Sequence, residues 1–328
     1  MQSDRPFVKI LLNNPERGMS RVQKRNLAID RFRGLTIIVM VIVNDLANVE
    51  GIPAMLKHAP KEAGLTAADL VSKAFIFAIA ATFALSFNKR AERGGKGDAY
   101  FHFFSRYLAI MGLGALFGTF ETVINGATVW GTLQTIGLAG LLTLLAIKLP
   151  AAARAVIAVL ILAGWQFVYQ SYNQIFTGEV GAMLEALTMA AALILSTAMI
   201  DMYNKGLKPF LISTGILSLA AFGPLLLSSV KVTKNNQLTF ILMCVAMCCV
   251  LYLAANLLSK VLPDKAGLTV WWGENPMLLY ILHLILTGIA MALDPRSLWV
   301  AIPIDLLILT ILSLIAWALH RKNYQFKF

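Results

Sequence analysis

Long apolar runs separated by short polar or basic segments dominate the chain. Each run has about 20 residues, the length that an α-helix needs to cross roughly 30 Å of hydrocarbon at about 1.5 Å per residue. Leu, Ala and Ile fill the runs without the alternation of a strand, and helices satisfy all their own backbone hydrogen bonds in lipid. The pattern therefore predicts an all-α, polytopic membrane protein with ten spans, at residues 31–49, 67–87, 102–120, 128–148, 153–170, 182–202, 209–228, 237–260, 269–291 and 298–319.

The composition agrees with this interpretation. Hydrophobic residues make up 58% of the chain and charged residues 14%, whereas a soluble domain has about 25% charged residues. Residues 1–24 are polar and basic, without the apolar core of a cleavable signal peptide, and are expected to form a cytoplasmic tail before the membrane domain. Cys244, Cys248 and Cys249 share one apolar run, which favours small core side chains over a redox or metal site. No metal is expected.

Lys and Arg are distributed unevenly between the connections that join the runs. In the ten-span arrangement, 22 of the 28 Lys and Arg residues fall on the side of the N-terminus and 6 on the other. Membrane proteins carry an excess of Lys and Arg in their cytoplasmic segments, so both termini are predicted to be cytoplasmic. This asymmetry accounts for the net charge of +11. Anionic membrane lipid is therefore an expected partner, and nucleic acid is not.

The first connection on the opposite side contains residues suited to acyl transfer. His58 lies in it, Asn44 ends the preceding span and Asp69 opens the next one. An imidazole exchanges protons near neutral pH, a carboxylate can orient its ring, and an amide can donate a hydrogen bond to a developing oxyanion. The same residues also fit a plain interfacial loop, because Asp is favoured at any helix N-terminus. Residue chemistry alone leaves both interpretations open.

Polar residues within the predicted spans suggest a path for a long, thin ligand. Arg33 and Asn44 are eleven residues apart, about 16 Å along a helix and close to three turns, so they share a face of the first span. Arg33 could hold a phosphate, although residue chemistry alone favours a cytoplasmic anchor. Asn275 and His283 are eight residues apart and are also predicted to share a face. Polar residues in spans usually face a bundle interior or a cavity, and the others are Gln134, Glu185 and Asp305.

Five segments form an ordered set of motifs. The first two are RNLAIDRFRGLTIIVMVIVND at 25–45 and HAPKEAGLTAADLV at 58–71, and the later ones are TLQTIG at 132–137, VTKNN at 232–236 and ENPMLLYILH at 274–283. The set resembles the heparan-α-glucosaminide N-acetyltransferase family and its bacterial relatives. The first two segments are the most specific, and the resemblance runs from about residue 25 to the C-terminus.

This resemblance implies that residues 25–328 form a transmembrane acyltransferase domain. Such an enzyme takes acetyl-CoA from the cytoplasm and acetylates an amino sugar or glycan on the other side. The proposed catalytic pair of the family falls on His58 and Asn44, and its aspartate falls on Asp69. Direct transfer and a covalent acetyl-histidine both stay open. The residues expected to contact acetyl-CoA are Arg33, Arg90, Arg106, Gln134, Asn275 and His283.

The setting of the enzyme follows from the same resemblance. The large luminal domain of some family members is missing before the first span, which favours a bacterial form in the cytoplasmic membrane. A homodimer is the candidate assembly. Lys61, Glu62 and Lys73 replace residues that are usual in the family near the site, so a different acceptor and a loss of activity both stay open. Lys73 falls one turn after the aspartate and is placed to pair with it.

Two other functions stay open. The DRFRG segment at 30–34 resembles the start of bacterial membrane O-acyltransferases of envelope polysaccharide. Those proteins carry a histidine eleven residues after the arginine, where this chain has Asn44. A polar path through a bundle would also serve a secondary transporter or a lipid flippase, although no repeated pair of broken spans is evident. Flux without an acetyl donor would distinguish a transporter, and an ester product would distinguish an O-acyltransferase.

Overall fold

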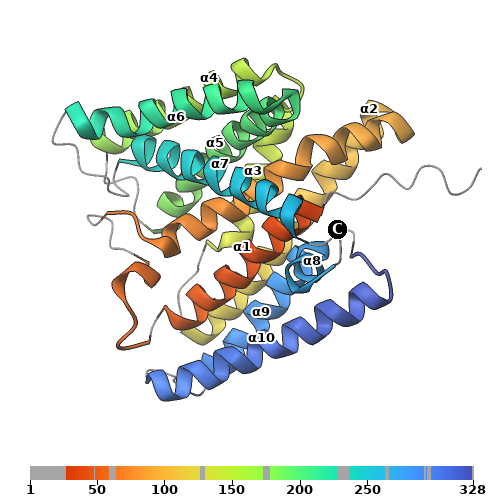
Figure 1. Ribbon diagram of the computed structural model, residues 1–328. Helices are drawn as coiled ribbons and strands as arrows, with labels where there is room; N and C mark the ends of the chain where they lie inside the picture. Colours follow the sequence, from red (N-terminus) through yellow and green to blue (C-terminus); the bar gives the residue numbers. More distant parts are fainter. Residues whose placement is uncertain are drawn as a thin grey trace, which may run out of the picture.

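A computed structural model describes residues 27–47, 49–58, 64–125, 130–172, 178–227, 236–262, 266–291, 293 and 297–326. The tail at 1–24, Lys61, Glu62 and most of the VTKNN motif lie outside these residues. All regular structure in the described part is helical. Its elements are α1 (Leu27–Leu46), the 3-10 turn η1 (Ala54–Leu56), α2 (Ala67–Asn125), α3 (Thr132–Ala146), α4 (Ala151–Ser171), α5 (Gly178–Lys205), α6 (Leu207–Leu227), α7 (Gln237–Val261), α8 (Leu268–Glu274), α9 (Pro276–Met291) and α10 (Leu298–Arg321). Figure 1 shows most of them running between the left-hand and right-hand sides of one bundle.

Helical structure occurs at each of the ten predicted ranges, which confirms an all-helical, multi-pass membrane protein. By length and composition, six helices of the described chain can cross a membrane, or seven if the bent pair α8 and α9 forms one span. That count takes α2 as one helix, excludes the 15-residue α3 as too short, and omits the charged α1. Ten crossings therefore stay a prediction.

Helix α2 is a hairpin of two arms. Gly95 separates them with a φ of +84°, a backbone conformation that glycine adopts without the steric penalty of a Cβ. Aromatic side chains hold the arms together. The rings of Phe83 and Tyr107 stack with centroids 5.5 Å apart, and those of Phe87 and Tyr100 meet edge to face at 4.9 Å. Both arms extend beyond the apolar runs at 67–87 and 102–120, because the polar segment between them is also helical.

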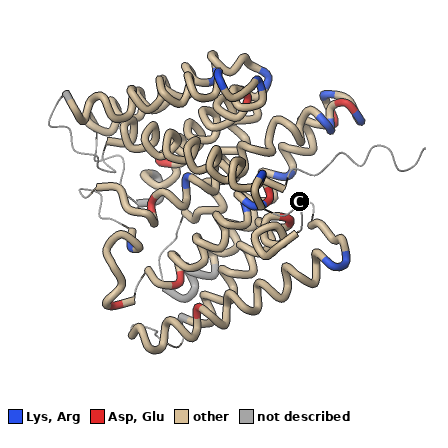
Figure 2. Tube along the Cα trace, in the orientation of Figure 1, with Lys and Arg blue, Asp and Glu red and all other residues tan. Residues whose placement is uncertain are grey.

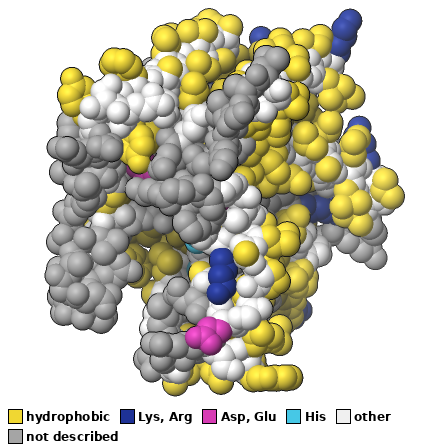
Figure 3. Space-filling model, turned by 90° about the vertical axis from the view of Figure 1, so that its left-hand side faces the viewer, with side chains coloured by type: hydrophobic (Ala, Val, Ile, Leu, Met, Phe, Trp, Pro, Cys, Tyr) yellow, Lys and Arg dark blue, Asp and Glu magenta, His cyan; other side chains and the backbone are white. Residues whose placement is uncertain are grey.

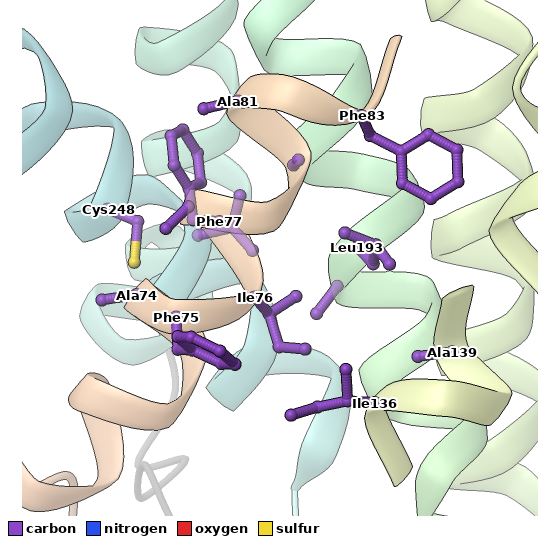
Figure 4. Close-up of a cluster of buried hydrophobic side chains, with 14 of the residues drawn as sticks. Ala74, Phe75, Ile76, Phe77, Ala81, Phe83, Ile136, Ala139, Leu193 and Cys248 are labelled. Carbon is purple, nitrogen blue, oxygen red and sulfur yellow. The ribbon is translucent and has the colours of Figure 1, made fainter. Parts of the chain in front are cut away.

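The first arm of α2 lies in the centre of the bundle. Figure 4 shows Phe77 of this arm on the side of Cys248 from α7, and Ile76 on the side of Leu193 from α5 and Ile136 from α3. In the most apolar stretch of each helix, 72% of α5 and 61% of α7 is buried inside the bundle. The corresponding buried shares of α4, α6 and α10 are only 28%, 22% and 22%. Apolar helices that leave most of their surface uncovered are suited to contact with lipid.

The predicted span 269–291 is not one straight helix. It consists of α8 and α9, which meet at an angle of 93° at Asn275. Pro276 explains the break, because proline lacks a backbone N–H and disfavours the helical conformation of the residue before it. The prediction that Asn275 and His283 share a helix face is therefore wrong. Asn275 lies at the corner, and His283 lies two turns into α9.

Helices α1 and α8 cross with their backbones in contact. A Cβ atom on Gly34 of α1 would lie 1.8 Å from the carbonyl oxygen of Thr269. A Cβ atom on Gly273 of α8 would lie 1.9 Å from the carbonyl oxygen of Asp30. Small residues at a crossing let helices in a membrane approach this closely. The two glycines therefore set the position of α8 against α1.

Basic residues gather on one side of the bundle. Figure 2 shows Lys and Arg concentrated on the right, where the α2 hairpin turns and α10 ends, with few on the left. Ion pairs that belong to this side include Arg90 with Asp98 at the α2 turn and Arg154 of α4 with Asp201 of α5. The chain therefore has one basic side. The cytoplasmic orientation of this side stays a prediction.

Gly34→Ala is expected to destabilise the protein by about 1–3 kcal/mol or to prevent its folding, because the added methyl group overpacks the crossing. Thermal unfolding in detergent measures the loss. Gly164→Ala is the matched control, since a Cβ atom there meets nothing within 4 Å, and it should leave the stability unchanged or raise it by up to about 1 kcal/mol. Equal unfolding temperatures for the two variants would contradict the crossing.

Candidate functional site

His58 and Asp69 meet at the start of α2. Thr66 precedes this helix, and its Oγ1 accepts a hydrogen bond from the backbone N–H of Asp69 at 3.3 Å. Thr66 Oγ1 also donates to Asp69 Oδ2 at 2.9 Å, a reciprocal arrangement related to the capping box. The other carboxylate oxygen, Oδ1, lies 3.0 Å from Nδ1 of His58, which follows η1. The helix cap therefore fixes the carboxylate that contacts the histidine.

This geometry selects one form of the His58 ring. A carboxylate only accepts hydrogen bonds, so Nδ1 of His58 is the donor to Asp69. The lone pair of the neutral ring is then on Nε2, which is the position from which a histidine accepts a proton. The Asp69 side chain is 3% exposed and the His58 side chain 49% exposed. The carboxylate is thus buried behind a ring that remains accessible.

A cavity of about 350 Å³ brings the three predicted catalytic residues together. Asn44 lines it from the last turn of α1, Asp69 from the first turn of α2, and His58 from the connection between them. We call it the His58 cavity. It lies on the side of the bundle opposite the basic residues, the side that Figure 3 faces. The size lies within the usual range for a small-molecule site.

Residues from distant parts of the chain complete the His58 cavity. Trp130 lies just before α3, Glu185 belongs to α5, and Gln237 and Phe240 belong to α7. Except for Glu185, which the sequence marks as polar within an apolar run, nothing local distinguishes them. Lys73 also lines the cavity. Its Nζ donates to Ser72 Oγ at 3.3 Å and lies 5.3 Å from the centre of the Phe240 ring.

Two of the arginines predicted to hold acetyl-CoA share a second, small cavity. Arg33 of α1 and Arg106 of α2 line it together with Pro276 and Met277, the first residues of α9. Its volume is about 30 Å³. Among the described residues, the buried Nε atom of Arg106 has no hydrogen-bond partner. We call this space the Arg33 cavity; it has room for about one water molecule, and its two guanidinium groups attract anions.

The other predicted contacts of acetyl-CoA line neither cavity. Arg90 forms an ion pair with Asp98, with Nε and Oδ2 2.9 Å apart. Gln134 caps α3, because its Oε1 accepts a hydrogen bond from the N–H of Gly131 at 2.6 Å. Asn275 holds the C-terminal segment by donating to the carbonyl of Tyr324 at 3.1 Å and accepting from the N–H of Phe326 at 2.7 Å.

His283 belongs to a separate buried cluster. Its Nδ1 lies 2.9 Å from Oγ1 of Thr287, which donates to Asp45 Oδ1 at 2.6 Å. Asp305 of α10, another residue noted in the sequence, interacts with Asp45. The cluster joins α1, α9 and α10 in the bundle interior. Hydrogen bonds between helices therefore account for these polar side chains in the bundle interior.

Residues 25–181 match the family model described as heparan-alpha-glucosaminide N-acetyltransferase, catalytic. The match contains Asn44, His58 and Asp69 and bears out the resemblance predicted from the first motifs. It ends before the segments at 232–236 and 274–283. No curated protein matches the chain.

Gln134→Ala is expected to lower the stability of the protein by about 1 kcal/mol, because the N–H of Gly131 loses its acceptor. Thermal unfolding without ligand is the measurement. Gln134→Glu keeps an acceptor oxygen and should retain most of the stability. The role in donor binding would be supported instead if Gln134→Ala unfolded at the wild-type temperature without ligand and acetyl-CoA raised that temperature less than in the wild type.

Proposed function

Through residues 25–181 this chain belongs to the heparan-α-glucosaminide N-acetyltransferase family, and we propose that it transfers the acetyl group of cytoplasmic acetyl-CoA to an amino sugar or glycan on the other side of the membrane. One observation carries this proposal. His58, Asn44 and Asp69 line a single cavity on the side opposite the basic residues. A bacterial cytoplasmic membrane is the proposed location.

Each residue of the His58 cavity has a role in the transfer. The acceptor nitrogen or oxygen attacks the thioester carbonyl while Nε2 of His58 takes its proton. Asn44 donates a hydrogen bond to the oxyanion of the tetrahedral intermediate. The carbon–sulfur bond then breaks, and the proton passes from His58 to the thiolate of CoA. Asp69 orients the ring and stabilises the imidazolium between these steps.

The Arg33 cavity provides the donor end of the site. Arg33 and Asn44 lie near opposite ends of α1, and helix α1 rises about 1.5 Å per residue, so they are about 16 Å apart along it. A phosphate of acetyl-CoA held by Arg33 and Arg106 would leave the extended pantetheine arm to reach the His58 cavity. This division lets the nucleotide stay on the basic side while the acetyl group reaches the other.

His58→Ala is expected to lower the turnover of acetyl transfer by about 10²–10⁴-fold through loss of the base. Asn44→Ala should lower it by about 10²–10³-fold through loss of the oxyanion donor, with acetyl-CoA affinity little changed. Purified protein, labelled acetyl-CoA and a panel of amino sugars and glycans provide the assay.

His102→Ala is the control for His58, since His102 lies on the second arm of α2 and lines neither cavity. Its turnover should match that of the wild type. Wild-type turnover of His58→Ala would exclude the proposed base. Substrate flux in vesicles without an acetyl donor would favour the transporter alternative.

The double variant Arg33→Gln/Arg106→Gln should raise the KM for acetyl-CoA by about tenfold or more, because each arginine contributes a charge-assisted hydrogen bond to a phosphate. The change in kcat should be smaller. Arg93→Gln removes an exposed charge near the α2 turn and should leave both parameters unchanged. If the wild type, the double variant and Arg93→Gln had the same KM for acetyl-CoA, acetyl-CoA would bind elsewhere.

A further inference from the structure

The part of the His58 cavity lined by α5 and α7 carries a carboxylate that the transfer mechanism does not use. Glu185 of α5 and Gln237 of α7 both line the cavity, and Gln237 Nε2 donates to Glu185 Oε1 at 3.2 Å. Gln237 is 5% exposed and sits in the first turn of α7, where Asn236 caps the helix. A buried amide anchored at a capped helix end therefore holds the carboxylate in place.

A hydrogen bond between helices could by itself account for such a pair. The surroundings of Glu185 indicate that it can also bind a ligand. Within the described part of the chain, the Glu185 carboxylate accepts a hydrogen bond from Gln237 alone, and a carboxylate has lone pairs for more. In contrast, both oxygens of Asp69 are engaged, one by His58 and the other by Thr66. Glu185 is thus the carboxylate of this cavity with capacity to bind a ligand.

The charges of the cavity favour a cation. Among the described residues, the charged ones that line it are Asp69, Glu185 and Lys73, and the other titratable ones are His58 and Tyr280 with its phenol. Two carboxylates against one ammonium leave an excess of one negative charge when His58 is neutral. Lys73 lies over the Phe240 ring, which offsets part of its field by a cation–π contact.

An amine acceptor has the matching charge. An α-amino group has a pKa of about 8 in water, so a comparable amino sugar reaches the protein largely as an ammonium ion. A hydroxyl acceptor is neutral. Trp130 also lines the cavity, and its indole N–H donates to Thr135 Oγ1 at 2.9 Å.

We propose that Glu185, held by Gln237, binds the ammonium group of the acceptor and thereby selects an amino sugar over a hydroxyl acceptor. The inference rests on the proposed acetyl transfer and decides between amide and ester products. Binding and chemistry then involve different groups. Glu185 attracts the ammonium, one proton passes from the bound ammonium to solvent water to give the free amine, and His58 takes the second proton during attack.

Glu185→Gln tests the proposal, because it removes the charge and keeps the shape. The KM for glucosamine should rise roughly 10- to 100-fold, the range expected for one hydrogen bond between charged groups. The kcat at saturating glucosamine and the KM for acetyl-CoA should stay within about threefold. Any transfer to glucose, which has a hydroxyl in place of the amine, should be unaffected. Glu50→Gln removes an exposed carboxylate outside the cavity and should change nothing.

A binding measurement separates this inference from the proposed function. In the His58→Ala background, glucosamine but not glucose should raise the unfolding temperature, and Glu185→Gln should abolish that shift. An unchanged KM and an unchanged shift in Glu185→Gln would overturn the role of Glu185 even if the wild type transfers acetyl groups. Absence of CoA release by the wild type with every acceptor would overturn the transferase, while the glucosamine shift would still report on Glu185. If Glu185→Gln lowered acetyl transfer to glucosamine and to glucose by the same factor, Glu185 would have a purely structural role.

Discussion

The backbone contact between α1 and α8 at Gly34 and Gly273 positions the elements that build both cavities. Helix α1 carries Arg33 beside this contact and Asn44 near its far end. Helix α8 leads directly into the corner at Asn275, from which α9 brings Pro276 next to Arg33. A side chain larger than hydrogen at either glycine would push the helices apart, since their carbonyls already occupy the space.

The corner between α8 and α9 is stabilised from outside the helices. Asn275 bonds to two backbone groups of the C-terminal segment, and Glu274 accepts a hydrogen bond from His320 at the end of α10 at about 3.0 Å. Lipid offers no partners to backbone groups, and the Asn275 side chain supplies two to the C-terminal segment. These contacts tie the C-terminal segment to the corner beside the Arg33 cavity.

Polar side chains in this bundle serve two purposes that the sequence does not distinguish. Arg154 with Asp201, and Asp45 with Thr287 and His283, pair with each other between helices. Asp69 and Glu185 have partners as well, but they also line a cavity. A polar residue in an apolar run therefore indicates a buried interior, and only the presence of a cavity beside it indicates a ligand.

The sequence by itself determined what depends on local or periodic features. Apolar runs specify helices, and Asp69 meets His58 because both lie on one connection and the adjoining helix cap, eleven residues apart. Tertiary structure decided the rest. Gln134 and Asn275 stay predicted contacts of the donor, and the structure shows that Gln134 caps α3 and that Asn275 holds the tail. Asn275 does not share a face with His283, because spacing predicts a shared face only along an unbroken helix. Glu185, Gln237 and Trp130 join the site through packing of α3, α5 and α7, and contacts between distant segments leave no local pattern in the chain.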